Sequence, residues 1–496
     1  MPETIPQPKD RWELPVPFGV YADNGQVLEG LDEAAFAAFS QYEQERRGSN
    51  EHQALKAKAQ GSEADYGVSA AEVDDPNDLT ETGWAVLFSP SAGAEIQQAL
   101  EPLLKLRREQ AGDLFKIFQG EDGFVASDQD AYGWLKRYQL NLDQPVNPRS
   151  GIPYYLLIVA PPEEISFEFQ YTLDIQWAVG RIWFPDAAEF RRYAESVVRY
   201  ESADDVTTSR QVAVFAPEHE FDRATQLFTR HVAKPLVNGA DPIGRKRKYG
   251  LQAFLGEDAT RETLHRIWSG SLEHGPPALL FSGGHGMAFR AGDPAQESSQ
   301  GAIVCQDWEG YPLRREDYYT ASDLPAAAKI HGLVHFFFAC YGAGWPHFDN
   351  FSREKKEPVT IAPKPMLARL PQALLAHPNG GALAVIGHVD RAWAYSFQSS
   401  DNVAQIDSFR DATARILRGE RLGNAMDQFN IRWATLSEKL AELQYEWSLR
   451  DATDSDFETQ KAKQISTQWV ARDDARNYIV FGDPAVQLRV KDMPAL

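Results

Sequence analysis

A histidine and a cysteine each stand at the end of an apolar run in the second half of the chain. PALLFSGGHG carries His285 just past its last apolar residue, and HFFFACYGAG carries Cys340 into a glycine turn. A cysteine thiol has a pKa of about 8.5 and is mostly protonated at neutral pH, so an imidazole that takes its proton makes it a usable nucleophile. The pair predicts acyl transfer.

The glycines around these two residues have a physical role. Gly284 and Gly286 let the backbone approach a substrate without a Cβ, and the amides of Gly286 and Cys340 are placed to donate to a developing oxyanion. A lone cysteine beside phenylalanines is most often a buried apolar filler, and Cys305, which lacks a glycine turn, keeps that interpretation. For Cys340 we favour a catalytic role instead, because His285 stands at the end of the preceding strong strand.

Alternating strands and helices must position the two residues. Short apolar runs, many followed by amphipathic stretches, are typical of a parallel sheet covered by helices on both faces, and we predict strands at 84–88, 114–118, 154–160, 211–216, 249–255, 277–283, 335–340 and 382–387. At the carboxyl ends of parallel strands, loops gather side chains from several strands. We therefore expect residues 285 and 340 at one edge of a sheet.

Eight strands exceed what one small sheet usually holds, so we expect two α/β units. The predicted organisation is a polar, helical N-terminal extension at 1–80, a smaller α/β subdomain at 81–240, and a catalytic subdomain at 241–496 with a helical C-terminal insertion and a closing strand.

Five stretches resemble the gingipain-type cysteine peptidases of the caspase-like clan and, more distantly, the CHAT domains of bacterial caspase relatives. They are WAVGRIWF with its trailing helix, FSGGHG, FACYGAG, GALAVIGHVDRAWAYSF and YIVFGDPAVQLR, which together cover roughly residues 83–491. Cys340 also lies 55 positions after His285, close to the roughly 50 of caspases. The resemblance implies a caspase-like α/β fold with a smaller and a larger subdomain.

The resemblance also implies roles for individual residues. Cys340 becomes the nucleophile, His285 the general base and acid, and Gly286 with the Cys340 amide the oxyanion hole. Trp393 falls where the family places a tryptophan against the first specificity pocket. Asp174 lies near the place of the acidic pocket-floor residue of members that cut after Arg or Lys, at a different offset, so a basic specificity does not follow.

A third catalytic acid is expected from the loop before the Gly-Arg strand, where Glu163, Glu164 and Glu168 remain alternatives. Relatives hold structural calcium, but nothing in this sequence identifies a site for it. HExxH and CxxC are both absent, so we predict no metal and no cofactor in the chemistry.

Composition excludes several classes of partner. The 50 basic and 71 acidic residues give a net charge of −21, which disfavours nucleic acid and anionic membranes. No run approaches the roughly 18 apolar residues of a membrane helix. The start has no secretory signal and the chain has two cysteines, so a cytoplasmic setting is expected.

The sequence therefore predicts an intracellular cysteine endopeptidase that acts on a protein or peptide substrate through a Cys340/His285 dyad. A partner protein or a processing event is expected to activate it. The alternative is a catalytically silent caspase-like module that binds a signalling partner. A nucleotide-binding regulator is a weaker third hypothesis, because no glycine fingerprint follows the first strand.

Overall fold

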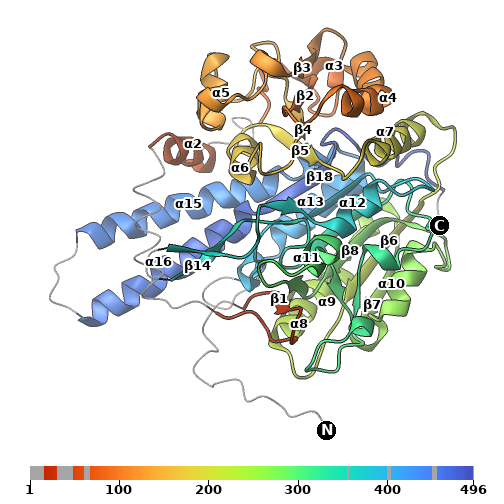
Figure 1. Ribbon diagram of the computed structural model, residues 1–496, viewed down its shortest axis with the longest axis vertical. Coiled ribbons are helices and arrows are strands. Elements are labelled where there is room, and N and C mark those ends of the chain that lie inside the picture. The colour runs from red at the N-terminus through yellow and green to blue at the C-terminus, as the bar shows by residue number, and fades with distance from the viewer. Residues whose placement is uncertain are drawn as a thin grey trace.

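One ten-stranded sheet forms the centre of the protein (Figure 1). The computed structural model describes residues 16–30, 49–60, 67–354, 357–398, 404–449 and 455–494. In spatial order the strands are β3 (Phe115–Phe118), β2 (Trp84–Phe88), β4 (Tyr155–Val159), β5 (Ala178–Ile182), β18 (Tyr478–Gly482), β17 (Ala384–His388), β12 (Val334–Phe338), β8 (Pro277–Gly283), β6 (Ser209–Ala216) and β7 (Gly250–Leu255).

Neighbouring strands of this sheet pair in parallel, except that β17 and β18 are antiparallel. The strand β18 therefore joins two oppositely directed halves into one continuous sheet. One half of the sheet holds β2 to β5, and the other half holds β6 together with β7, β8, β12 and β17. The proposed domain limits at residues 80 and 240 stay a prediction.

Burial explains why these segments are strands. Every residue of β2, β4, β5, β8, β12, β17 and β18 is buried, as expected for strands covered on both faces. Helices lie along the sheet (Figure 1), among them α4 (Ala94–Ala111), α7 (Ala187–Ser202), α10 (Arg261–Trp268), α12 (Arg369–Leu375) and α13 (Asp407–Arg418). The predicted α/β class with a mainly parallel sheet is confirmed, and all eight predicted strands are present.

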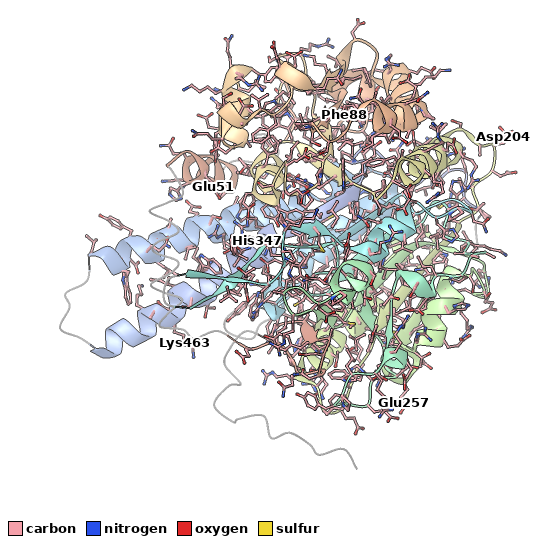
Figure 2. All side chains as sticks on the ribbon, in the orientation of Figure 1. Glu51, Phe88, Asp204, Glu257, His347 and Lys463 are labelled. Atoms are coloured by element: carbon pink, nitrogen blue, oxygen red, sulfur yellow. The ribbon has the colours of Figure 1, made fainter. Side chains whose placement is uncertain are left out.

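The helix α7 shows how the sequence makes a covering helix. Asp186 caps it by accepting a hydrogen bond from the Glu189 amide at 2.9 Å. Phe190, Tyr193 and Val197 then recur at helical spacing and are fully buried. Exposed and polar positions take the opposite face. Figure 2 shows the same division over the whole molecule, with Phe88 inside and Asp204 and Glu257 at the periphery.

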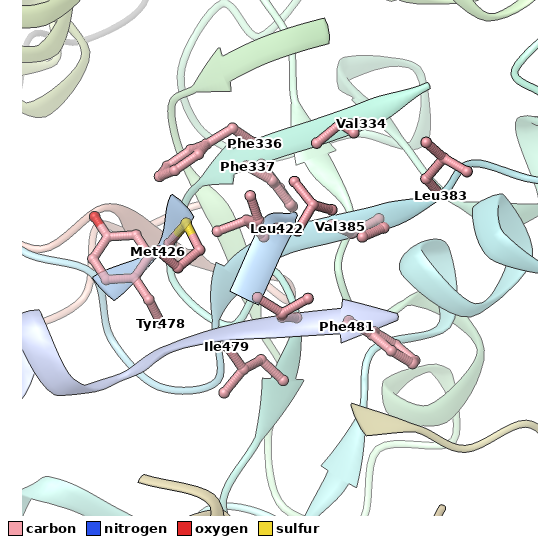
Figure 3. Packing of buried hydrophobic residues seen from close by; sticks show 14 of the residues in the cluster. Val334, Phe336, Phe337, Leu383, Val385, Leu422, Met426, Tyr478, Ile479 and Phe481 are labelled. Atoms are coloured by element: carbon pink, nitrogen blue, oxygen red, sulfur yellow. The ribbon is translucent and has the colours of Figure 1, made fainter. Parts of the chain in front are cut away.

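The packing beside the central strands is dense and apolar. Phe336 on β12, Val385 on β17 and Tyr478 on β18 lie beside the short helix α14 (Leu422–Ala425) in Figure 3. Leu422 of this helix and Met426, the residue after it, belong to the same core, and all five residues are at most 6% exposed. Close-packed interiors of this kind resist displacement. The turns that leave β8 and β12 therefore start from a rigid base.

Two long helices near the C-terminus, α15 (Asp427–Ser448) and α16 (Ser455–Arg476), form a hairpin that projects from the sheet (Figure 1). The helix α2 (Ser49–Gln60) packs on α15, where Lys58 Nζ lies 2.7 Å from Asp427 Oδ1. Within the described ranges, no helix combines the length and the apolar character that crossing a membrane requires.

Candidate functional site

His285 and Cys340 follow neighbouring strands. β8 and β12 pair in parallel, with Gly283 opposite Phe338, so each strand delivers its residue two positions past its end. The prediction that adjacent strands bring both to one edge of the sheet is confirmed. The turn after the cysteine is tight: Tyr341 has a φ of 56°, in the left-handed region, and its amide donates to the Asp390 carbonyl at 2.9 Å.

The sulfur of Cys340 is sealed from solvent. The residue is 0% exposed, Sγ accepts a hydrogen bond from the Ala392 amide at 3.2 Å, and the thiol contacts the Ala392 carbonyl at 3.5 Å. Burial raises the pKa of the thiol, which outweighs the opposing effects of the hydrogen bonds and of Arg391. In this arrangement the thiol is protonated.

The imidazole of His285 has a carboxylate partner. Its Nε2 lies 2.9 Å from Oδ2 of Asp222, and both side chains are at most 4% exposed. Both ring nitrogens are buried, and within the described part of the chain neither has a partner in hydrogen-bond geometry, so the contact of Nε2 with Asp222 is one of charge and proximity. An imidazole with Nε2 against a carboxylate and no partner on Nδ1 can take up and return a proton at Nδ1.

Asp222 is fixed as the cap of the short helix α8 (Arg223–Phe228). Its Oδ2 accepts from the amide and the hydroxyl of Thr225, both at 2.8 Å. Burial alone would raise the pKa of Asp222, but the charge of His285 and these hydrogen bonds outweigh it and lower the pKa to about 2. The carboxylate is therefore ionised.

The three glutamates named as alternatives for a third acid lie elsewhere. Glu163 pairs with Lys364 at 3.0 Å, Glu164 accepts from the Ser91 amide at 3.1 Å, and Glu168 is exposed in the first turn of α6 (Phe167–Asp174). Sequence reasoning missed Asp222. A usable signal was present, because the loop after the predicted strand 211–216 contains an Asp followed three residues later by Thr, a helix-cap pattern.

Two backbone amides converge on one carbonyl oxygen at this edge. The amides of Gly286 and Cys340 donate to the carbonyl of Phe18 at 3.0 and 2.9 Å. Two N–H groups that face one carbonyl oxygen are the arrangement that an oxyanion hole requires, and the role of Gly286 in such a hole stays a prediction. Gly286 has to be glycine, since a Cβ there would lie 2.0 Å from the carbonyl oxygen of Cys340.

Trp393 and Asp174 lie in different surroundings. The Trp393 backbone runs beside Pro17, and its fully buried ring packs against Phe351 at a centroid distance of 5.2 Å. Asp174 ends α6 and accepts from the Val179 amide at 3.2 Å; burial raises its pKa well above the ordinary value. The roles of these two residues in substrate binding stay predictions.

No cluster of metal ligands appears in the part of the chain that the structure describes, where no group of three or more His, Cys, Asp or Glu side chains could hold an ion.

Comparison with known proteins identifies the family. No curated protein matches the sequence. Solved structures with similar folds include "Structure of Protease" (13% identity, 83% of this chain and 80% of that one, TM-score 0.48). The Arg-specific cysteine proteinase gingipain R is 12% identical, with 84% of this chain and 80% of that chain covered and a TM-score of 0.43. A complex of Porphyromonas gingivalis RgpB pro- and mature domains is 12% identical, with 82% of this chain and 80% of that chain covered and a TM-score of 0.44. The model of peptidase family C25 matches residues 131–489. The chain therefore belongs to peptidase family C25, the gingipain family of cysteine-type peptidases.

Proposed function

We propose that the protein is an endopeptidase in which Cys340 is the nucleophile and His285 the general base and acid. The observation that carries this proposal is the convergence of the Gly286 and Cys340 amides on a peptide carbonyl oxygen, at 3.0 and 2.9 Å, immediately beside the Cys340 side chain. A thiol next to a carbonyl whose oxygen is already held by two donors is poised for acyl transfer.

Each group then has a distinct task. His285 takes the thiol proton at Nδ1 as sulfur adds to the carbonyl carbon, and it returns that proton to the departing amine. Asp222 holds Nε2 and stabilises the imidazolium that forms between the two steps. The Gly286 and Cys340 amides stabilise the negative oxygen of the tetrahedral intermediate.

Turnover of added substrates requires that the burial of the thiol be relieved. The raised pKa of Cys340 comes mainly from burial, and the atoms over the sulfur include the backbone of Gly19, from which a Cβ would lie 3.0 Å from Sγ. Cys340 becomes accessible to added substrates when this N-terminal segment leaves, because solvent and the imidazole then stabilise the thiolate.

The test compares the purified wild-type chain with Cys340→Ala and His285→Ala on an unstructured protein substrate, with products identified by mass spectrometry. We expect cleavage by wild type and a loss of at least about a hundredfold in each variant. Cys305→Ser is the matched control, because the thiol of this second buried cysteine contacts the carbonyl of Ile303, two residues before it.

Identical products from wild type and Cys340→Ala would refute the proposal and favour the silent interaction module. The cytoplasmic setting and control by a partner protein stay predictions, which fractionation of the source cells and affinity capture with the Cys340→Ala chain would test.

A further inference from the structure

The N-terminal segment of the protein crosses the candidate site as an extended strand. Residues 16–18 run antiparallel to residues 392–394: the Phe18 amide donates to the Ala392 carbonyl at 2.9 Å, and the Ala394 amide donates to the Val16 carbonyl at 3.0 Å. Strand addition of this kind is a general way for a protein to hold an extended peptide.

The same strand continues on the other side of Cys340. β1 (Gly19–Tyr21) pairs in parallel with β9 (Gly286–Ala288), with Gly19 opposite Gly286. The Phe18 carbonyl lies between the two pairings, and its oxygen receives the amides of Gly286 and Cys340. The peptide bond that enters the oxyanion hole is therefore the one between Phe18 and Gly19.

The side chain of Phe18 fills an aromatic pocket. It is 0% exposed, and its ring centroid lies 4.8 Å from Phe338, 5.7 Å from Phe397 and 6.2 Å from Phe228, with edge-to-face orientations throughout. Phe228 and Phe338 stack on each other at 5.2 Å. The ring of His285 is a fourth neighbour, with its centroid 6.2 Å from that of Phe18 and its plane tilted. The three phenylalanine rings favour a bulky aromatic group, and an ionised side chain would lose its hydration among them.

The space around Gly19, the residue after this bond, leaves no room for a side chain. A Cβ on Gly19 would lie 2.8 Å from Cys340 Cβ and 2.7 Å from Leu28 Cδ1, both closer than ordinary van der Waals contact. Glycine at this position lets the backbone pass directly over the thiol.

We infer that this peptidase cuts after a bulky aromatic residue and that its first substrate is its own Phe18–Gly19 bond. The inference rests on the proposed function, since it uses the same thiol, imidazole and amides. It adds the substrate class, aromatic before the cut and glycine after it, and it assigns the docked N-terminal segment the role of a built-in substrate that keeps the thiol covered until it is cut.

The reaction consumes one peptide bond and one water molecule. Cys340 Sγ gives its proton to His285 and forms a bond to the Phe18 carbonyl carbon. The carbon–nitrogen bond to Gly19 then breaks as the imidazole returns the proton to the Gly19 nitrogen, which becomes the new amino terminus. Water, deprotonated by His285, hydrolyses the thioester, releases the Phe18 carboxylate and restores the thiol. No oxidation or reduction is involved.

The experiment follows the purified full chain over time by intact mass and N-terminal sequencing, in wild type, Phe18→Tyr, Phe18→Asp and Cys340→Ala. We expect wild type and Phe18→Tyr to lose residues 1–18 and begin at GVYADNG, Phe18→Asp to be at least about a hundredfold slower, and Cys340→Ala to stay intact. The rate should be first order and independent of protein concentration, because the docked segment belongs to the same chain.

A second arm uses coumarin peptides that end in Val-Pro-Phe, Val-Pro-Arg or Val-Pro-Asp, which copy residues 16–18 and vary the last position. We expect kcat/KM to be at least about tenfold higher for Val-Pro-Phe. Cys340-dependent cleavage of added substrates with an intact Phe18–Gly19 bond, or with a preference for Arg or Asp, would overturn the inference and leave the proposed function standing. Absence of Cys340-dependent hydrolysis of every substrate would refute the proposed function itself.

Discussion

Adding one methyl group at Gly19 should uncover the thiol of Cys340. In the docked segment, the Cβ of Gly19→Ala would lie 2.8 Å from Cys340 Cβ and 2.7 Å from Leu28 Cδ1. Leu28 can relieve its contact by turning its flexible side chain, but Cys340 Cβ is held by the backbone turn that follows β12. The methyl group therefore pushes the segment away from the sulfur.

The size of the effect follows from the strain of this contact. Overpacking by a methyl group costs about 1–3 kcal/mol. Each 1.4 kcal/mol changes an equilibrium about tenfold, so the undocked fraction of the segment should rise roughly 5- to 150-fold. Because iodoacetamide reaches the thiol when the segment is undocked, the alkylation rate of Cys340 should rise by the same factor.

The assay measures iodoacetamide labelling of Cys340 by peptide mass mapping, which separates it from Cys305. All chains carry His285→Ala, so that self-cleavage cannot remove the segment. Gly30→Ala is the matched control, since a Cβ at Gly30 meets nothing within 4 Å. Equal labelling rates in the Gly19→Ala, Gly30→Ala and parent chains would refute the idea that residues 18–19 cover the thiol.

Three further predictions concern the groups around the site. Gly286→Ala should lower kcat about a hundredfold or more, since its Cβ would lie 2.0 Å from the Cys340 carbonyl oxygen and displace an oxyanion donor. Gly284→Ala should change kcat little, because the nearest atom to its Cβ lies at 3.4 Å. Steady-state kinetics, with circular dichroism as a folding check, would measure both, and equal losses in the two variants would contradict this prediction. Asp222→Asn should lower kcat by about 10²–10⁴-fold. The pKa of Asp222 is about 2 in the folded protein against an ordinary 3.8, so its carboxylate stabilises the fold above pH 3.8, and this stability is lost as pH falls toward 2; Asp222→Asn should remove it. Kinetics and acid unfolding curves that match those of wild type would contradict both statements. Burial and the nearby Asp349 raise the pKa of Asp390 to about 7, so the stability that the protonated carboxyl contributes below pH 3.8 is lost as pH rises through 7. Between pH 4 and 8, urea unfolding of Asp390→Asn should therefore show a loss of unfolding free energy smaller than that of wild type, by on the order of a few kcal/mol. Parallel curves for the two proteins would contradict this.

Much of the fold could be predicted because most of its strands are short and mainly apolar. The runs at 277–283 and 335–340 end in glycine turns, and their parallel pairing in the structure brings His285 and Cys340 to one edge as expected. The local pattern does not reveal which strands become neighbours across the chain. β18 pairs with β17 on one side and with β5 on the other, and this long-range choice makes one sheet of strands that the count of apolar runs divides between two units.

Two parts of the site could not be deduced in this way, for different physical reasons. Asp222 lies 63 positions before His285, and its pairing with the imidazole depends on β6 lying beside β8, which no residue pattern specifies. The segment around Phe18 is short and follows a polar, proline-containing start, so it lacks the period of a strand. It becomes extended because residues 286–288 and 392–394 provide partners for its backbone.

The central claim, hydrolysis of peptide bonds by Cys340, is tested most directly by the cleavage profile of a whole proteome digested with the wild-type chain beside its Cys340→Ala form. The account predicts a set of new amino termini present only with wild type, most of them following Phe, Tyr or Trp. The same termini in both digests, or none in either, would contradict it.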